Sequence, residues 1–177
     1  MNIEHISVSR KSCADQCFQS YKYKYHLRLD PIGPEPFYFV YGKIIHKIAE
    51  EYVGCQGERM LSEVALDVLH GKIPIERGES DVFAPELPAD YKRRMPEHLR
   101  SIKKITDEMG YTGQLEHHFH YDLDPPNNKC VKGFIDRLIQ KGDYWFILDY
   151  KTTKKGKWRK DAQSIVHDLQ LRTYARV

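Results

Sequence analysis

The Gly142-Asp143 pair constrains the fold of this chain most strongly, because it separates two apolar segments by the two residues of a tight turn. The flanking segments, "CVKGFIDRLIQ" and "YWFILDYKT", are rich in strand-forming residues, so the sequence predicts an antiparallel hairpin. If the pair forms the turn, counting outward from it places Asp136 opposite Asp149. We expect "YWFIL" to be a buried strand that carries Asp149 and Lys151 at its end.

Asp136, Asp149 and Lys151 would then converge at one end of the hairpin. Opposed residues have Cβ atoms about 4.5–5.5 Å apart, and two carboxylates at that distance repel each other unless positive charge lies beside them. Lys151 projects from the same face as Asp149, about 6–7 Å farther along. Such a cluster suits phosphodiester hydrolysis with Mg²⁺ or Mn²⁺. This spacing of acids and a lysine is more common at strand ends where the side chains simply face water.

Hydrophobic periodicity assigns the rest of the chain mainly to helices. Of the 177 residues, 41 % are hydrophobic and 30 % charged, which is typical of one globular domain. The pattern predicts helices over 9–26, where "YKYKY" also alternates like a strand, and over 39–53, 58–70 and 88–110. The period then changes, and strands over 114–124, 130–140 and 144–152 are followed by a final helix.

Composition also bears on location and partners. The sequence has no apolar run of the roughly 18 to 20 residues that a membrane span requires, and its first residues lack the apolar centre of a signal peptide, so we expect a cytoplasmic protein without a membrane partner. In that compartment the four cysteines are expected to be free thiols. The net charge of +3 permits a polyanionic partner without requiring one.

Two predicted helices carry polar side chains at a spacing of four. Gly42 and His46 share one face of the helix over 39–53, where the glycine would allow close approach to the sheet. Gln170 and Tyr174 likewise share a face of the last helix. By itself, a histidine on a helix is more often an ordinary core or surface residue than a metal ligand, and Gln170 with Tyr174 fits an ordinary amphipathic surface.

Taken in order, these motifs resemble the RecB-type branch of the PD-(D/E)XK nuclease superfamily. Its G-x-x-x-H, G-x-x-D, D-Y-K-T and Q-x-x-x-Y motifs correspond here to Gly42 with His46, "GFID", "DYKT", and Gln170 with Tyr174. The resemblance covers residues 7–175. It implies a single α/β domain over 1–177, with a restriction-endonuclease-like core and a small mixed central sheet flanked by helices. Within it would lie a helical insertion over about 58–110, a catalytic sheet over about 114–152 and a C-terminal helix over about 161–177.

The resemblance also implies roles for individual residues. Lys151 would be the catalytic lysine, and Gln170 and Tyr174 would contact DNA or support the site. The Mg²⁺ or Mn²⁺ ion would be bound by His46, Asp136, Asp149, the backbone carbonyl of Tyr150 and, from the preceding strand, Glu116. Two departures, Ile135 in place of the nominal proline and Asp149 in place of the frequent glutamate, are common in this branch.

Some relatives hold an iron-sulfur cluster with one N-terminal cysteine and three near the C-terminus. Cys17 matches the first position, but no cysteine follows Cys130. We therefore predict no cluster and expect Cys17 to be a packed thiol.

A basic segment follows the predicted catalytic strand. "KTTKKGKWRK" has six Lys or Arg among ten residues and no acid. Such a run is usually a solvated loop, but beside a phosphodiesterase site it favours phosphate contact and stacking of a base on the tryptophan. The predicted DNA-binding residues are Lys154, Lys155, Lys157, Trp158, Arg159 and Lys160. "YKRRMPEHLRSIKK" and "YKYKYHLR" would either line a groove or be solvated helix faces.

The expected function is metal-dependent DNA hydrolysis. The resemblance favours an exonuclease on single-stranded or end-containing DNA, in recombination, repair or phage DNA metabolism, with recombination or repair proteins as partners. A catalytically silent nucleic-acid-binding module of a recombination complex is the main alternative. A zinc-binding domain is a third, since His118 and His120 share a strand face, although a solvated or DNA-facing set that includes His117 is the more common explanation.

Overall fold

The hairpin around Gly142 and Asp143 is confirmed in the computed structural model. Strand β2 (Lys129–Lys141) pairs with β3 (Tyr144–Leu148) in antiparallel fashion, from Lys141 opposite Tyr144 to Arg137 opposite Leu148. Gly142 has a φ of 59°, a left-handed conformation that suits a tight turn. The ladder ends at Leu148, so Asp149 lies just beyond the strand and next to Asp136 in the predicted register.

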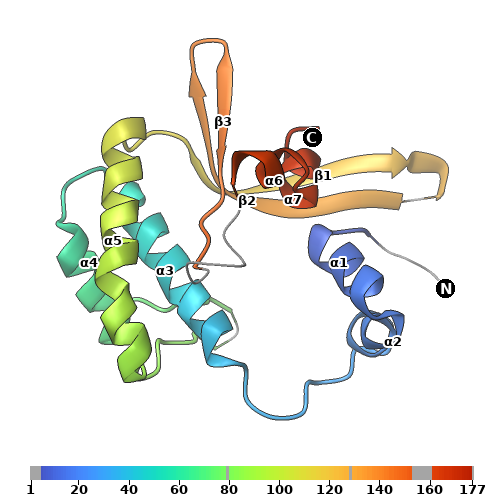
Figure 1. Cartoon of the computed structure of the whole chain (residues 1–177), viewed down its shortest axis with the longest axis horizontal. Coiled ribbons are helices and arrows are strands. Elements are labelled where there is room, and N and C mark those ends of the chain that lie inside the picture. Colours follow the sequence, from blue (N-terminus) through green and yellow to red (C-terminus); the bar gives the residue numbers. More distant parts are fainter. Residues whose placement is uncertain (1–4, 79, 128, 153–160, 177) are drawn as a thin grey trace.

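The structure describes residues 5–78, 80–127, 129–152 and 161–176. Figure 1 shows a sheet with helices below and in front of it. Before the sheet come α1 (Val8–Gln16), α2 (Phe18–Tyr21), a π-helical turn (Lys22–His26), α3 (Phe37–Gly54), α4 (Leu61–Leu69) and α5 (Ala89–Met109). A short 3₁₀ turn (Pro125–Asn127) joins β1 (Gln114–Asp124) to β2, and α6 (Ala162–Val166) and α7 (Leu169–Tyr174) follow β3.

The predicted α/β fold with a small central sheet is confirmed. The strand order is β1-β2-β3 and both pairings are antiparallel. A parallel bridge joins Ile6 to Val131 on β2, with the Ile6 amide donating to the Cys130 carbonyl at 2.8 Å. The arrangement is consistent with a restriction-endonuclease-like core. No helix in the described ranges is both long and apolar enough to cross a membrane.

The apolar stripe of α3 forms the larger core. Ile44, Ile48 and Tyr52 are buried and pack with residues of α4 and α5 such as Val64 and Ile102. Burying a side chain of this size contributes about 1.5–3 kcal/mol, so this stripe fixes α3 firmly against its neighbours. Since His46 lies on α3, the same packing holds the histidine in place.

A smaller core holds α7 on the sheet. Phe119 of β1, Ile135 of β2 and Tyr174 of α7 are buried together, and the Phe119 and Tyr174 rings meet edge to face at 5.5 Å. This contact brings the polar face of α7 to the end of the β2–β3 hairpin.

Arg137 joins the sheet to the end of α5. Its side chain is fully buried and donates hydrogen bonds to the carbonyls of Gly110 and Thr112, at 2.5 to 3.1 Å. A buried guanidinium is tolerated where carbonyl oxygens accept hydrogen bonds from it, and the C-terminal end of a helix favours positive charge.

The expected burial of "YWFIL" is wrong. Tyr144 is 74 % exposed and Trp145 is 56 % exposed, and only Ile147 and Leu148 are partly buried. The reason is visible in Figure 1, where the hairpin extends beyond the helices, so its tip has no layer to pack against.

The first and last predicted helices are each interrupted. Cys17 is extended, with φ −159° and ψ 106°, and separates α1 from α2. It is exposed rather than packed, and its sulfur accepts the Ser20 amide. Asp168 separates α6 from α7 because it caps α7, accepting the Leu171 amide at 2.9 Å. None of the four cysteines forms a disulfide, as expected.

Two glycines give a test of local packing. At Gly113 the φ is 117° and a Cβ would lie 2.6 Å from the Leu138 carbonyl oxygen, whereas at Gly42 it would lie 3.6 Å from Thr152 Oγ1, an ordinary contact. We expect Gly113→Ala to lower the free energy of unfolding by roughly 2 kcal/mol or more. Gly42→Ala should raise it by about 0.5–1 kcal/mol through helix propensity. Urea unfolding measures both, and a Gly113→Ala protein as stable as the wild type would contradict the packing described.

Candidate active site

Three elements bring potential metal ligands to one point. His46 from α3, Glu116 from β1 and Asp136 from β2 each offer a ligand atom, and these atoms lie within 4.8 Å of one another. One imidazole nitrogen and two carboxylates form a donor set of the kind that binds divalent cations. In the part of the chain that the structure describes, this is the cluster of His, Cys, Asp and Glu side chains with metal-binding geometry.

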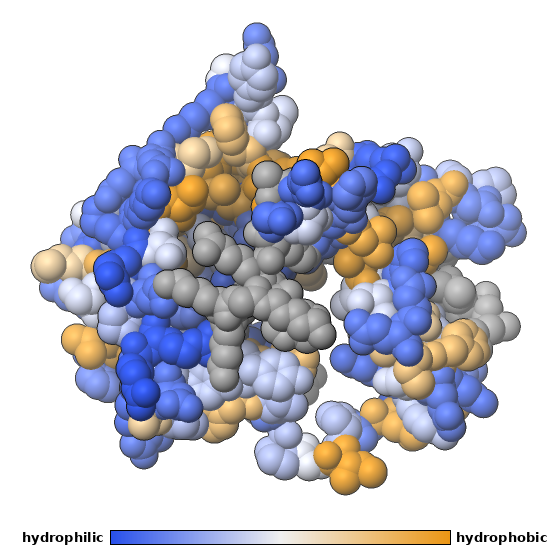
Figure 2. Space-filling view, viewed as in Figure 1, coloured by the Kyte–Doolittle hydropathy of each residue, from blue (hydrophilic) through white to orange (hydrophobic). Residues whose placement is uncertain are grey.

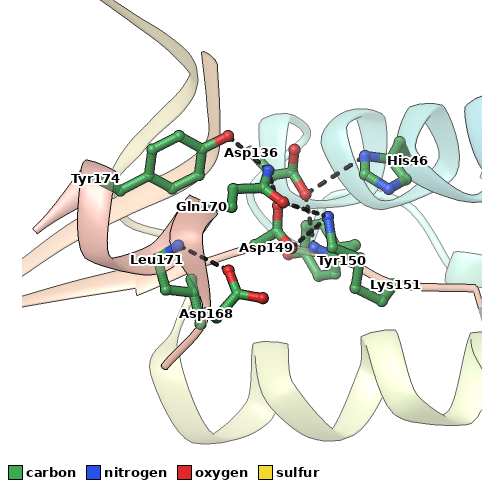
Figure 3. Close-up of polar contacts among 9 residues, drawn as sticks. All are labelled: His46, Asp136, Asp149, Tyr150, Lys151, Asp168, Gln170, Leu171 and Tyr174. Carbon is green, nitrogen blue, oxygen red and sulfur yellow. Dashed lines mark hydrogen bonds and ion pairs between the residues drawn. The ribbon is translucent and has the colours of Figure 1, made fainter. Parts of the chain in front are cut away.

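Asp136 is the centre of this arrangement. Its side chain is only 13 % exposed, and its Oδ2 accepts the backbone N–H of Tyr150 at 2.6 Å. The same oxygen lies 3.4 Å from His46 Nδ1 (Figure 3). The hydrogen bond from Tyr150 holds the chain that leaves β3 against β2 after the ladder has ended.

Glu116 has an unusual backbone for a strand residue. Its φ is 46°, in the left-handed region, although the pairs on either side, Leu115 with Arg137 and His117 with Ile135, keep one register. That register places Glu116 opposite Asp136. A non-glycine residue in this conformation costs about 1–3 kcal/mol, and such strain clusters at functional sites. No sequence pattern indicated this conformation.

A second polar network lies beside the cluster, at the end of β3. Lys151 Nζ is 2.6 Å from Asp149 Oδ2 and donates to Gln170 Oε1 at 3.0 Å. The Gln170 amide nitrogen lies 2.9 Å from Asp149 Oδ1 and 2.6 Å from the Tyr174 hydroxyl oxygen. Figure 3 shows these side chains converging from β3 and α7 on the cluster around Asp136.

The pKa of His46 is raised by its neighbours. Burial lowers it, but the hydrogen bond and the charge of Asp136, with a hydrogen bond to the Tyr150 backbone, have the larger combined effect. The contact with Tyr150 places the predicted carbonyl ligand beside the histidine, and the two rings meet edge to face.

Two carboxylates also have raised pKa values. Burial raises the pKa of Asp149, whose side chain is 9 % exposed, more than the contact with Lys151 lowers it. For Glu116, removal from water comes first and repulsion by Asp136 and Glu50 adds to it. Carboxylates that lie close together without enough positive charge nearby favour binding of protons or of a metal cation.

A cavity of about 1150 Å³ opens onto this site. His46, Glu116 and Lys151 line it, together with the exposed aromatics Tyr38 and Phe39 of α3. Its cations are Lys43, Lys47, Arg77, Arg94 and Lys151 and its acids Glu50, Glu76 and Glu116. Arg94, from the basic segment "YKRRMPEHLRSIKK", lies over the Tyr41 and Tyr91 rings and donates to the Thr152 carbonyl at 3.0 Å.

The other predicted binding residues have different outcomes. Lys154, Lys155, Lys157, Trp158, Arg159 and Lys160 lie outside the described residues. The basic face of α5 is hydrophilic in Figure 2, and its cations Lys92, Arg93, Lys103 and Lys104 pair with nearby acids, as on a solvated helix. His120 pairs with Asp122 at 3.0 Å and the His118 ring packs on Phe134, so among the described residues neither belongs to the metal-binding cluster.

Comparisons with known proteins place the chain in a family. A search of curated proteins and a search of solved structures each found no significant match. A model of the PD-(D/E)XK nuclease superfamily, in contrast, matches residues 5–177, and this range contains every site residue described above. The chain therefore belongs to the PD-(D/E)XK nuclease superfamily.

Proposed function

We propose that this protein is a Mg²⁺- or Mn²⁺-dependent deoxyribonuclease that acts as an exonuclease on single-stranded or end-containing DNA. Membership of the superfamily implies a metal-dependent nuclease. The observation that carries the proposal is the convergence of His46, Glu116 and Asp136 beside the Asp149–Lys151 pair.

The donor set fits a hard divalent cation. Two carboxylates and one imidazole nitrogen converge, with the Tyr150 backbone beside them. Asp149 would complete the set, because each of its oxygens accepts one hydrogen bond and retains a further lone pair. When bound, the cation supplies charge that polarises the phosphate and acidifies a water molecule.

The remaining residues of the site orient the reacting groups and balance their charge. Lys151 holds its ammonium 2.6 Å from Asp149, where it would orient a nucleophilic water and offset charge that develops on the phosphate. Gln170 fixes both partners through its amide, and its hydrogen bond with Tyr174 fixes the amide in turn. Such support is what keeps reacting groups in a productive geometry.

The finer parts of the proposal rest on the order of the motifs. Gly42 with His46, "GFID", "DYKT", and Gln170 with Tyr174 favour the RecB-type branch, and with it an exonuclease in recombination, repair or phage DNA metabolism. A cytoplasmic location remains a prediction from the sequence. The alternative, a catalytically silent module, would bind DNA without cleaving it.

Cleavage assays test the residue assignment. We expect Asp149→Ala and Lys151→Ala each to lower the rate of cleavage by about 10²–10³-fold, because each removes charge placed for the transition state. Labelled single- and double-stranded DNA with Mg²⁺ or Mn²⁺ is the assay, and Asp143→Asn, in the exposed hairpin turn, is the matched control. Absence of cleavage by the wild type with either metal would exclude the proposed activity and favour the silent module.

Metal titration tests the ligand set separately from catalysis. Glu116→Gln should weaken Mn²⁺ binding about tenfold or more, since it replaces a charged ligand by a neutral one. Glu108→Gln, on the exposed surface of α5, should leave binding unchanged. Isothermal titration calorimetry measures both, and equal affinities for the two variants would rule Glu116 out as a ligand.

The affinity for Mn²⁺ should also depend on pH. The pKa of His46 is raised from the ordinary value of 6.5, so the metal must displace a proton that Asp136 stabilises. Binding should therefore tighten as the pH rises above 6.5, toward and through the raised pKa of His46, and release protons, which titrations in two buffers of different ionisation enthalpy detect. A His46→Gln variant should lose this part of the pH dependence. An affinity of the wild type that falls with rising pH would contradict it.

A further inference from the structure

One face of the β1–β2 pair continues from the candidate metal ligands toward α1. His118 lies opposite Phe134 and His120 opposite Lys132, and the same register places Glu116 opposite Asp136. Alternate residues share a face, and each such step is about 7 Å along a strand. The face therefore presents two carboxylates, then an aromatic pair, and then a pair of basic side chains.

A cavity of about 650 Å³ lies where this face meets the free edge of β2, and α7, which packs on the opposite face, contributes to its lining. It is lined by His5, Ser7, Val8, Ser9, Ser12, His118, Lys132, Gly133, Phe134, Gln170 and Tyr174. This size is within the range of small-molecule sites. The described residues of the lining include a lysine and two histidines but no carboxylate, which distinguishes this cavity from the larger one beside α3.

The cavity adjoins the catalytic network. The edge of β2 that faces away from β1 is paired at two places, with Ile6 at Val131 and with β3 from Arg137 onward. The β2 residues that line the cavity lie between these two pairings. Gln170 and Tyr174 line it as well, and Gln170 also contacts Asp149 and Lys151. A ligand in this cavity would therefore touch a residue that touches the candidate catalytic pair.

Phe134 gives the cavity an aromatic platform. Its side chain is 56 % exposed, and its ring lies 4.9 Å from that of His118 at an angle of 49°. An exposed ring backed by a second ring is suited to stacking on a nucleic-acid base. Lys132 lies one step farther along β2 and is the lysine among the described residues that line the cavity.

We propose that this cavity binds one unpaired nucleotide next to the scissile phosphate, with its base stacked on Phe134 and a backbone phosphate beside Lys132. The inference rests on the proposed nuclease function for the position of the scissile phosphate. It specifies a single-stranded substrate at this point, because a base within a duplex has its faces covered by neighbouring bases and cannot stack on a side chain.

Binding of a fluorescent single-stranded oligonucleotide, measured by anisotropy in the presence of EDTA, tests this without cleavage. Phe134→Ala should weaken binding roughly 5- to 100-fold, and Phe134→Trp should restore it. Tyr144→Ala, which removes another exposed ring from the hairpin tip, is the matched control and should bind like the wild type. Lys132→Gln should reduce the salt dependence of binding by about one phosphate contact.

A scan with single abasic sites identifies the stacked base. In the wild type, one abasic position should weaken binding, and in Phe134→Ala that position should no longer matter, because the ring and the base are coupled. The inference is overturned if the wild type does not bind the oligonucleotide, if Phe134→Ala binds equally well, or if the abasic effect persists in that variant. If the wild type shows the expected abasic effect on binding but cleaves no DNA, the proposed nuclease activity is refuted and the assignment of the cavity as a nucleotide site stands.

Discussion

The hydrogen bond from the Tyr150 backbone to Asp136 is the contact on which the site depends. The β2–β3 ladder ends at Leu148, and this bond, 2.6 Å long, continues the contact between the two segments by one more step. It places Asp149 and Lys151 on either side of a fixed point and brings the Tyr150 backbone to His46. The Asp136 side chain here replaces the backbone hydrogen bond that would join the two segments within the strand. Its carboxylate remains close to the other candidate ligands.

Much of this geometry follows from local rules, which explains why the sequence predicts it. A two-residue turn leaves only one register for the hairpin, and that register fixes which residue faces Asp149. Gln170 and Tyr174, four apart on α7, lie on one helical face, and their side chains meet at 2.6 Å. His46 is predicted for the same reason, since the apolar stripe of α3 determines how the helix is rotated.

The features that were not predictable depend on contacts between distant segments. The left-handed backbone of Glu116 has no signature in its neighbours, and only the packed sheet can hold it. Whether the "YWFIL" strand is buried depends on where the helices end, which the apolar character of the strand does not encode. Cys17 and Asp168 interrupt helices because capping of the next helix competes with helix continuation, and the outcome is decided by packing.

The amide of Gln170 gives the catalytic network a direction. Its oxygen can only accept, and it faces Lys151, while its nitrogen can only donate, and it faces Asp149. The side chain therefore fixes one direction of hydrogen bonding, from Lys151 to the amide oxygen and from the amide nitrogen to Asp149 Oδ1. A neutral residue thus orients both members of an ion pair, one of which, Asp149, has its pKa raised by burial.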